Sequence, residues 1–106
     1  MRILLDACVP KRLRESLAGH AVRTAPEMGW GDLDNGRLLD AMAGGFDVLV
    51  TVDKRLPERR VVEGRAFGVV VLRAKTNRLA DLLPLVPRLL DALAGLAPGT
   101  VVEIGT

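Results

Sequence analysis

Cysteine, histidine and aromatic residues are scarce in this chain of 106 residues. Cys8 is the only cysteine and His20 the only histidine, which excludes an internal disulfide, a cysteine zinc cluster and a histidine-rich metal site. The aromatic residues are Trp30, Phe46 and Phe67, so leucine, valine and alanine must build the core. A stacking platform for nucleic-acid bases is not expected, because such platforms need several aromatic side chains.

The chain also lacks a long apolar run and a strong excess of charge. No apolar run approaches the roughly 18 residues that span a bilayer, and a strand is expected from residue 2, where a signal peptide would otherwise stand. Together with the single cysteine, this predicts a cytoplasmic protein. The net charge of +2 permits a polyanionic partner without requiring one. With 49% hydrophobic and 26% charged residues, the chain is expected to form one globular domain over 1–106.

Two short apolar runs are each followed by an aspartate. Residues 1–5, which are apolar apart from Arg2, lead into Asp6, and residues 48–52 lead into Asp53. Such runs, bounded by turn residues, indicate strands that are buried on both faces. In open α/β sheets, ligands bind outside the carboxyl ends of the strands. The sequence therefore predicts two carboxylates side by side at one edge of a parallel sheet.

The rest of the chain alternates between predicted strands and helices. Further strands are expected at 21–24, 69–72 and 100–104, and helices at 11–17, 35–43 and 78–96. Asp34 and Asn77 are candidate caps for the second and third helices, and Pro84 and Pro87 should kink the third or divide it in two. This alternation predicts an α/β fold, namely a three-layer α/β/α sandwich with a mainly parallel sheet. The expected order of the first four strands is second, first, third, fourth, with the last strand at an edge.

Neighbouring carboxylates repel one another unless they are protonated or bridged by a cation. Mg²⁺ or Mn²⁺ is the natural bridge, since both prefer oxygen ligands. Such an ion can activate a bound water and clamp a phosphodiester, which makes Asp6 and Asp53 the catalytic candidates. Alternatively, each aspartate only caps a turn. Further candidate ligands are Asp34, Asn35, Asp40 and Glu27; as alternatives, Asp34 is a helix cap, Asp40 a solvated residue and Glu27 a loop acid.

Basic residues follow the third and fourth predicted strands, and therefore gather at the same edge of the sheet. Taken singly, each arginine fits ordinary solvated surface. Taken together, cations beside metal-binding carboxylates suit the phosphate backbone of a nucleic acid. The candidate nucleic-acid-binding residues are Lys54, Arg55, Arg59, Arg60, Arg73 and Lys75.

The predicted last helix holds more leucine than one buried stripe needs. Apolar residues recur through 79–94 on more than one helical face. We expect part of this stretch to contact a partner chain, with a homodimer as the simplest case.

Several motifs resemble those of a known family: ILLDACVP at 3–10, EMGW at 27–30, DNGRLLDAM at 34–42, DVLVTVDKRLP at 47–57 and VVVLRAKTNRLADLLPLVP at 69–87. With the T-x-D of 51–53 as its most specific part, the chain resembles small bacterial and archaeal PIN-like proteins. These are compact relatives of the PIN-domain ribonucleases, which include VapC-type toxins of toxin–antitoxin pairs. The resemblance implies an α/β/α sandwich, Mg²⁺ or Mn²⁺, and hydrolysis of RNA phosphodiesters at a pocket that contains Asp6 and Asp53. It also implies an antitoxin as a possible partner.

Two other functions stay open. Ala7 stands where relatives often carry an acid or amide, and Asn35 stands where acids are common. These departures favour a catalytically weakened or inactive PIN-like module that binds RNA or a partner protein. A receiver-like domain with Asp53 as phosphoacceptor is a further alternative, although Lys75 comes too early in the chain for the lysine that receivers use.

Overall fold

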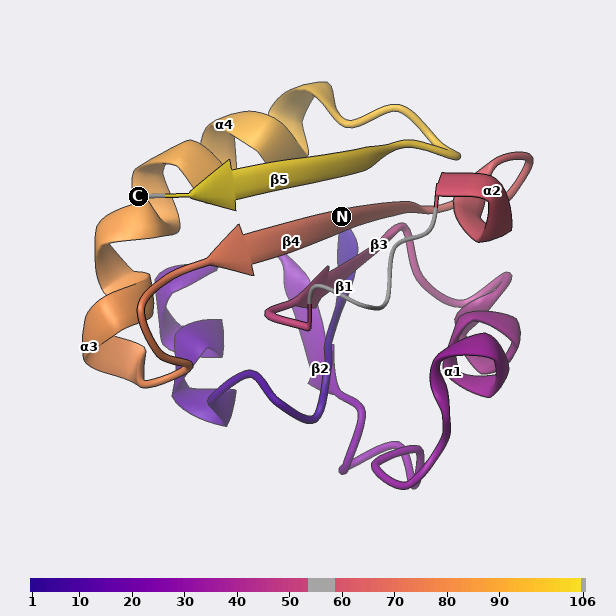
Figure 1. Cartoon of the computed structure of the whole chain (residues 1–106), viewed down its shortest axis with the longest axis horizontal. Helices are drawn as coiled ribbons and strands as arrows, with labels where there is room; N and C mark the ends of the chain where they lie inside the picture. Colours follow the sequence, from indigo (N-terminus) through magenta and orange to yellow (C-terminus); the bar gives the residue numbers. More distant parts are fainter. Residues whose placement is uncertain (54–58, 106) are drawn as a thin grey trace.

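A five-stranded, all-parallel sheet forms the centre of the molecule (Figure 1). The computed structural model describes residues 1–53 and 59–105. The strands lie in the order β2-β1-β3-β4-β5, so the predicted order of the first four strands is confirmed, and the last strand occupies an edge as expected. Their bounds are β1 (Arg2–Leu5), β2 (Ala21–Thr24), β3 (Val48–Thr51), β4 (Gly68–Arg73) and β5 (Val101–Gly105).

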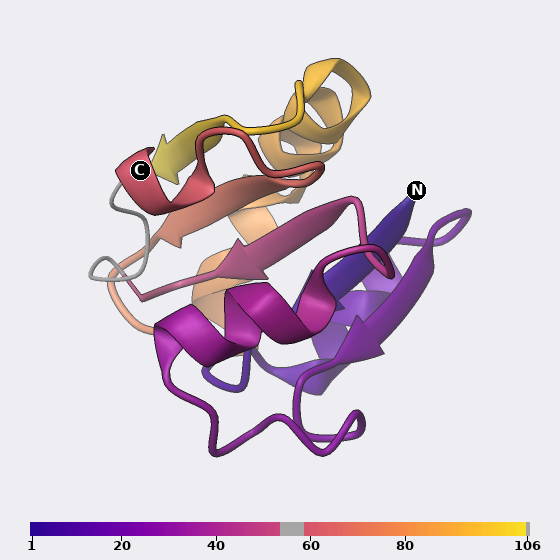
Figure 2. The same cartoon turned by 90° about the vertical axis from the view of Figure 1, so that its right-hand side faces the viewer.

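Helices cover both faces of the sheet, which confirms the predicted α/β class (Figure 2). One face packs against α1 (Asn35–Met42) and α2 (Arg59–Val62). The other packs against the 3₁₀ helix η1 (Lys11–Ser16), α3 (Leu79–Leu82), the 3₁₀ turn η2 (Leu83–Leu85) and α4 (Val86–Gly95). No helix in the described ranges has the length and apolar character to cross a membrane.

Local sequence signals explain how these helices begin and break. Asp34 caps α1, because its Oδ1 accepts the Arg37 N–H at 2.9 Å, as predicted. Pro84 lies in η2 and divides the predicted last helix into α3 and α4, since proline cannot donate the hydrogen bond that a continuous helix needs. The segment predicted as a helix over 11–17 is a 3₁₀ helix.

Strand β3 is the most buried element of the sheet. All its side chains are buried, with Val48 and Val50 in the core under α4 and Leu49 in the core under α1. Successive side chains of a strand point to opposite faces, so a strand between two helical layers needs apolar residues at every position. The apolar run of 48–52 therefore predicted its burial correctly.

The two ends of the sheet differ in chemistry. At the amino ends of the strands, the Asp47 carboxylate accepts the Arg2 backbone N–H at 2.7 Å and pairs with its guanidinium at 3.2 Å. The hydrogen bonds from Arg2 lower the pKa of Asp47. The carboxyl ends of β1 and β3 lead into Asp6 and Asp53. Helix α1 runs antiparallel to the strands and begins near their carboxyl ends (Figure 2).

Gly68 gives a direct test of the packing between α4 and β4. A Cβ atom at Gly68 would lie 2.8 Å from Cδ2 and 2.9 Å from Cγ of Leu96. We expect Gly68→Ala to lower the free energy of unfolding by about 1–3 kcal/mol, because overpacking displaces neighbouring side chains. Gly95→Ala is the matched control, since a Cβ there meets nothing within 4 Å. It should stabilise by up to about 1 kcal/mol, because alanine favours a helix.

Urea unfolding of both variants measures these changes. In the double variant Gly68→Ala/Leu96→Ala, the loss should be smaller than the sum of the two single losses, because the clash is removed. Additive losses would contradict a direct clash between the new methyl group and Leu96.

Candidate functional site

Thr51 connects the two predicted acids at the carboxyl edge of the sheet. It is the last residue of β3 and is fully buried. Its hydroxyl donates to Asp6 Oδ2 at 2.7 Å, and its Oγ1 accepts the Asp53 backbone N–H at 3.0 Å. Because β1 and β3 are neighbours with Leu5 opposite Val50, Asp6, which directly follows β1, comes beside Thr51. The Asp6 carboxylate and the Asp53 backbone N–H thus bind the same buried hydroxyl group.

The Asp6 carboxylate is held from several sides. Its Oδ1 accepts the Ala7 N–H at 2.8 Å, and its Oδ2 accepts the Cys8 thiol at 3.6 Å in addition to Thr51. An ionised carboxylate offers about four acceptor positions, so this half-buried group retains capacity for a further cation or donor. The fixed orientation is the property that a ligand-binding carboxylate needs.

Cys8 packs at the edge of this group as a neutral thiol. Burial raises the pKa of Cys8 above its ordinary value, and the charge of Asp6 acts in the same direction. Hydrogen bonds with the Val52 backbone and Thr51 oppose the shift without cancelling it. A thiol with a raised pKa is a poor nucleophile, so the structure gives Cys8 a packing role at this edge.

The other predicted metal ligands, Asp34 and Asn35, lie at the start of α1. Asp34 is exposed, caps the helix and pairs with Arg37 at 3.7 Å. Within residues 1–53 and 59–105, no group of three or more aspartate, glutamate, histidine or cysteine residues is arranged to hold a metal ion. The structure therefore connects the Asp6 carboxylate to the Asp53 backbone through Thr51, whereas the Asp34 carboxylate caps α1.

Asp40 and Glu27, the remaining acids considered, have structural partners. Asp40 pairs with Arg65 at 2.9 Å. Glu27 accepts the Thr24 N–H at 2.9 Å and the Arg14 guanidinium at 3.0 Å. The pKa of Glu27 is lowered, first by the bond from the Thr24 backbone and then by Arg14. Glu27 therefore secures the turn that follows β2.

The predicted basic residues divide into three groups. Lys75 lies in a hollow of about 360 Å³ between the end of β3 and the loop after β4. Arg73 lines the same hollow, but its guanidinium pairs with Glu103 of β5 at 3.2 Å. Arg60 is exposed on α2. The predictions for Lys54, Arg55 and the side chain of Arg59 lie outside what the structure describes.

Sequence reasoning missed the roles of Thr51 and Asn77. The T-x-D spacing was a usable signal, because a threonine hydroxyl readily bonds the N–H two residues later. The prediction that Asn77 caps the third predicted helix is wrong: the N-cap of α3 is Arg78, and no side chain of the described residues caps the helix. The Asn77 amide donates to the Cys8 carbonyl at 3.1 Å, which ties the β4–α3 loop to the loop after Asp6. No local pattern indicates such a contact.

The fold and this edge define the class of protein: an α/β domain with a parallel sheet and an acidic pair at the carboxyl ends of β1 and β3. A comparison of the chain with protein-family models, curated proteins and solved structures finds no match. The function must therefore be argued from the site itself.

Proposed function

We propose that this chain is a metal-dependent ribonuclease of PIN-like type, which hydrolyses RNA phosphodiesters at the carboxyl edge of its sheet. The observation that supports this most is the bridge by Thr51 between the Asp6 carboxylate and the Asp53 backbone. Two acids on adjacent parallel strands occupy the position where α/β sheets bind ligands.

The residues present fit Mg²⁺ or Mn²⁺ in their donor chemistry. Mg²⁺ commonly takes one or two carboxylates and completes its shell with water and phosphate oxygens. Asp6 and Asp53 would hold the ion, and the oriented Asp6 retains acceptor capacity for it. When bound, such an ion supplies an activated water and charge stabilisation at a phosphoryl oxygen.

The protein's own residues position this site and favour an anionic substrate. Thr51 and the Ala7 N–H fix the orientation of the Asp6 carboxylate. The hydrogen bond from the Asn77 amide to the Cys8 carbonyl fixes the loop that lines the hollow containing Lys75. Lys75 lines that hollow with an exposed ammonium group, which can contact a phosphate of an RNA strand.

Calorimetric titration with Mn²⁺ tests the proposal on the wild type, Asp6→Ala and Asp53→Ala. We expect each variant to weaken Mn²⁺ binding by more than about tenfold, since each removes a ligand. Asp91→Ala is the matched control, because Asp91 is an exposed aspartate of α4, outside the strands and loops that carry the acidic pair. Cleavage of a labelled RNA should be lost in the same two variants and kept in the control. Absence of Mn²⁺ binding up to millimolar metal would contradict the proposal.

A second candidate is a non-catalytic module that binds RNA or a partner protein at the same edge. It is favoured by the absence of a three-membered ligand group within the described ranges and by the use of Asp34 as a helix cap. Retention of RNA by the wild type, with no product after prolonged incubation with Mn²⁺, would support this module over the ribonuclease.

A further inference from the structure

A second hollow lies beside β2 and the start of β1, and neither Asp6, Thr51 nor Asp53 lines it. Its volume is about 440 Å³, and it opens beside the first residues of β1 and β2 and the residues that precede β3. Trp30 and Phe46 both line it, together with Met28. The chain has only three aromatic residues, so two of them converge at one surface site.

The aromatic wall of this hollow is built in advance of any ligand. The rings of Trp30 and Phe46 meet edge to face, with centroids 5.9 Å apart and planes at 76°. The backbone N–H of Trp30 donates to the Ala25 carbonyl at 2.9 Å, and the backbone N–H of Gly29 donates to the Pro26 carbonyl at 3.0 Å. Gly29 has a φ of +80°, which the turn requires and which other residues rarely adopt. The loop that presents Trp30 is therefore held by its own hydrogen bonds.

The charged side chains that line this hollow are both cationic. Arg2 and Arg23 both line it. Arg2 is neutralised by Asp47 at 3.2 Å and donates to the Gly44 carbonyl at 3.3 Å. Arg23 is exposed, and its side chain makes no ion pair or hydrogen bond within the described part of the chain, although its charge contributes to the lowered pKa of Glu27. Its register partner Leu4 belongs to the core under α1, so Arg23 lies on the same face of the sheet as that core.

We propose that this hollow binds a planar aromatic ring that carries an anionic group, such as the base and phosphate of a nucleotide. The volume lies within the range of about 300–1,000 Å³ that small-molecule sites occupy. The apolar wall of Trp30, Phe46 and Met28 suits a flat ring, and a guanidinium binds a phosphate or carboxylate through paired hydrogen bonds. The site does not depend on RNA hydrolysis, because it shares no described lining residue with the acidic pair.

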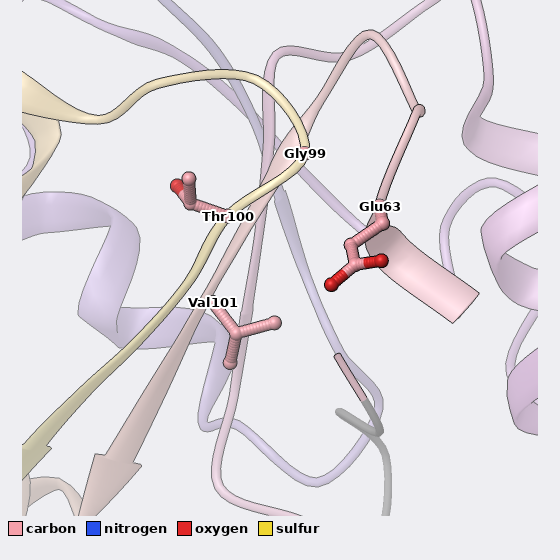
Figure 3. A pocket seen from close by; sticks show the side chains of 4 residues that line it. All are labelled: Glu63, Gly99, Thr100 and Val101. Carbon is pink, nitrogen blue, oxygen red and sulfur yellow. The ribbon is translucent and has the colours of Figure 1, made fainter. Parts of the chain in front are cut away.

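The described lining of a third hollow lacks the aromatic and cationic side chains found beside Trp30. About 260 Å³ of space lies between α2 and the start of β5, where Glu63 points its carboxylate toward Val101 (Figure 3). Its other lining residues are Gly99 and Thr100. It offers an exposed acid without an aromatic wall or a cation, so it lacks the combination found beside Trp30.

Trp30 provides the measurement, because it is the only tryptophan of the chain. Its fluorescence, excited at the red edge of the tryptophan band, is followed while AMP, adenosine or ribose 5-phosphate is added. We expect a saturable change with AMP, and binding of adenosine and of ribose 5-phosphate that is weaker by about tenfold each, since each lacks one of the two recognised groups. Equal responses to AMP and adenosine would overturn the proposal, as would the absence of a saturable response to AMP at millimolar concentration.

Arg23→Gln tests the charge, with Arg88→Gln as the matched control on α4. We expect Arg23→Gln to weaken AMP to the level of adenosine, while Arg88→Gln leaves AMP binding unchanged. Both variants should keep the wild-type melting temperature, because both arginines are exposed. Equal AMP binding by Arg23→Gln and wild type would contradict the site.

A short oligoadenylate distinguishes two sources of the same chemistry. Tighter binding than AMP would assign the site to a base and phosphate within an RNA strand, and weaker binding would assign it to free nucleotides. Because the variants Asp6→Ala and Asp53→Ala should bind AMP normally, failure of the ribonuclease proposal and failure of this one are separable.

Discussion

Thr51→Val is expected to lower the free energy of unfolding by about 2–4 kcal/mol, because it removes a buried hydroxyl that makes two hydrogen bonds, one of them to a carboxylate. Thr51 is fully buried, so water cannot replace the lost partner. The change leaves Asp6 without its bond of 2.7 Å and the Asp53 N–H without its bond of 3.0 Å. The orientation of the acidic pair should loosen, and Mn²⁺ affinity should fall with it. Urea unfolding and calorimetry measure the two effects.

Thr24→Val is the matched control for this variant. Thr24 is also a buried threonine at the carboxyl end of a strand, but its hydroxyl makes one neutral bond, from the Glu27 N–H at 3.3 Å. Its loss should cost about 1 kcal/mol and leave Mn²⁺ binding unchanged. Equal losses of stability and of Mn²⁺ binding in the two variants would show that Thr51 has no special relation to the acids.

Leu89→Ala should lower the free energy of unfolding by about 2–5 kcal/mol, because it leaves a cavity at a fully buried position on the inner face of α4. Leu90 is the next residue of the same helix and is 38% exposed. Leu90→Ala should therefore cost less than about 1 kcal/mol. The two variants change the same side chain in the same helix, so the difference between them measures burial rather than helix propensity. Urea unfolding at a fixed, low protein concentration makes the comparison.

This pair of variants also bears on the predicted homodimer. The buried leucines 82, 85, 89 and 93 account for most of the leucine excess, and the exposed ones are Leu83 at 44% and Leu90 at 38%. A homodimer through 79–94 stays a prediction. It requires that Leu90→Ala costs more at high protein concentration than at low concentration. A monomeric mass in light scattering at micromolar concentration would contradict it.

The order of the sheet could be predicted from the sequence because it depends on local patterns. Apolar runs at 2–5, 48–52 and 69–72 identify strands buried on both faces, and the helical segments between them require parallel strands with crossovers. These rules were sufficient to place Asp6 and Asp53 at one edge. The cap by Asp34 and the break at Pro84 follow from contacts and restrictions within a few residues.

The tertiary structure alone decided how the side chains at each end of the sheet meet. Thr51 and Asp6 are 45 positions apart, as are Arg2 and Asp47, and only the register between β1 and its neighbours brings them into contact. Trp30 and Phe46 likewise stand on opposite sides of α1 in the sequence, and no local pattern indicates that their rings meet edge to face. Composition counts residues and periodicity reports which face is buried, but neither specifies which distant side chains become neighbours. That information lies in strand register and loop conformation, which the packing of the whole chain sets.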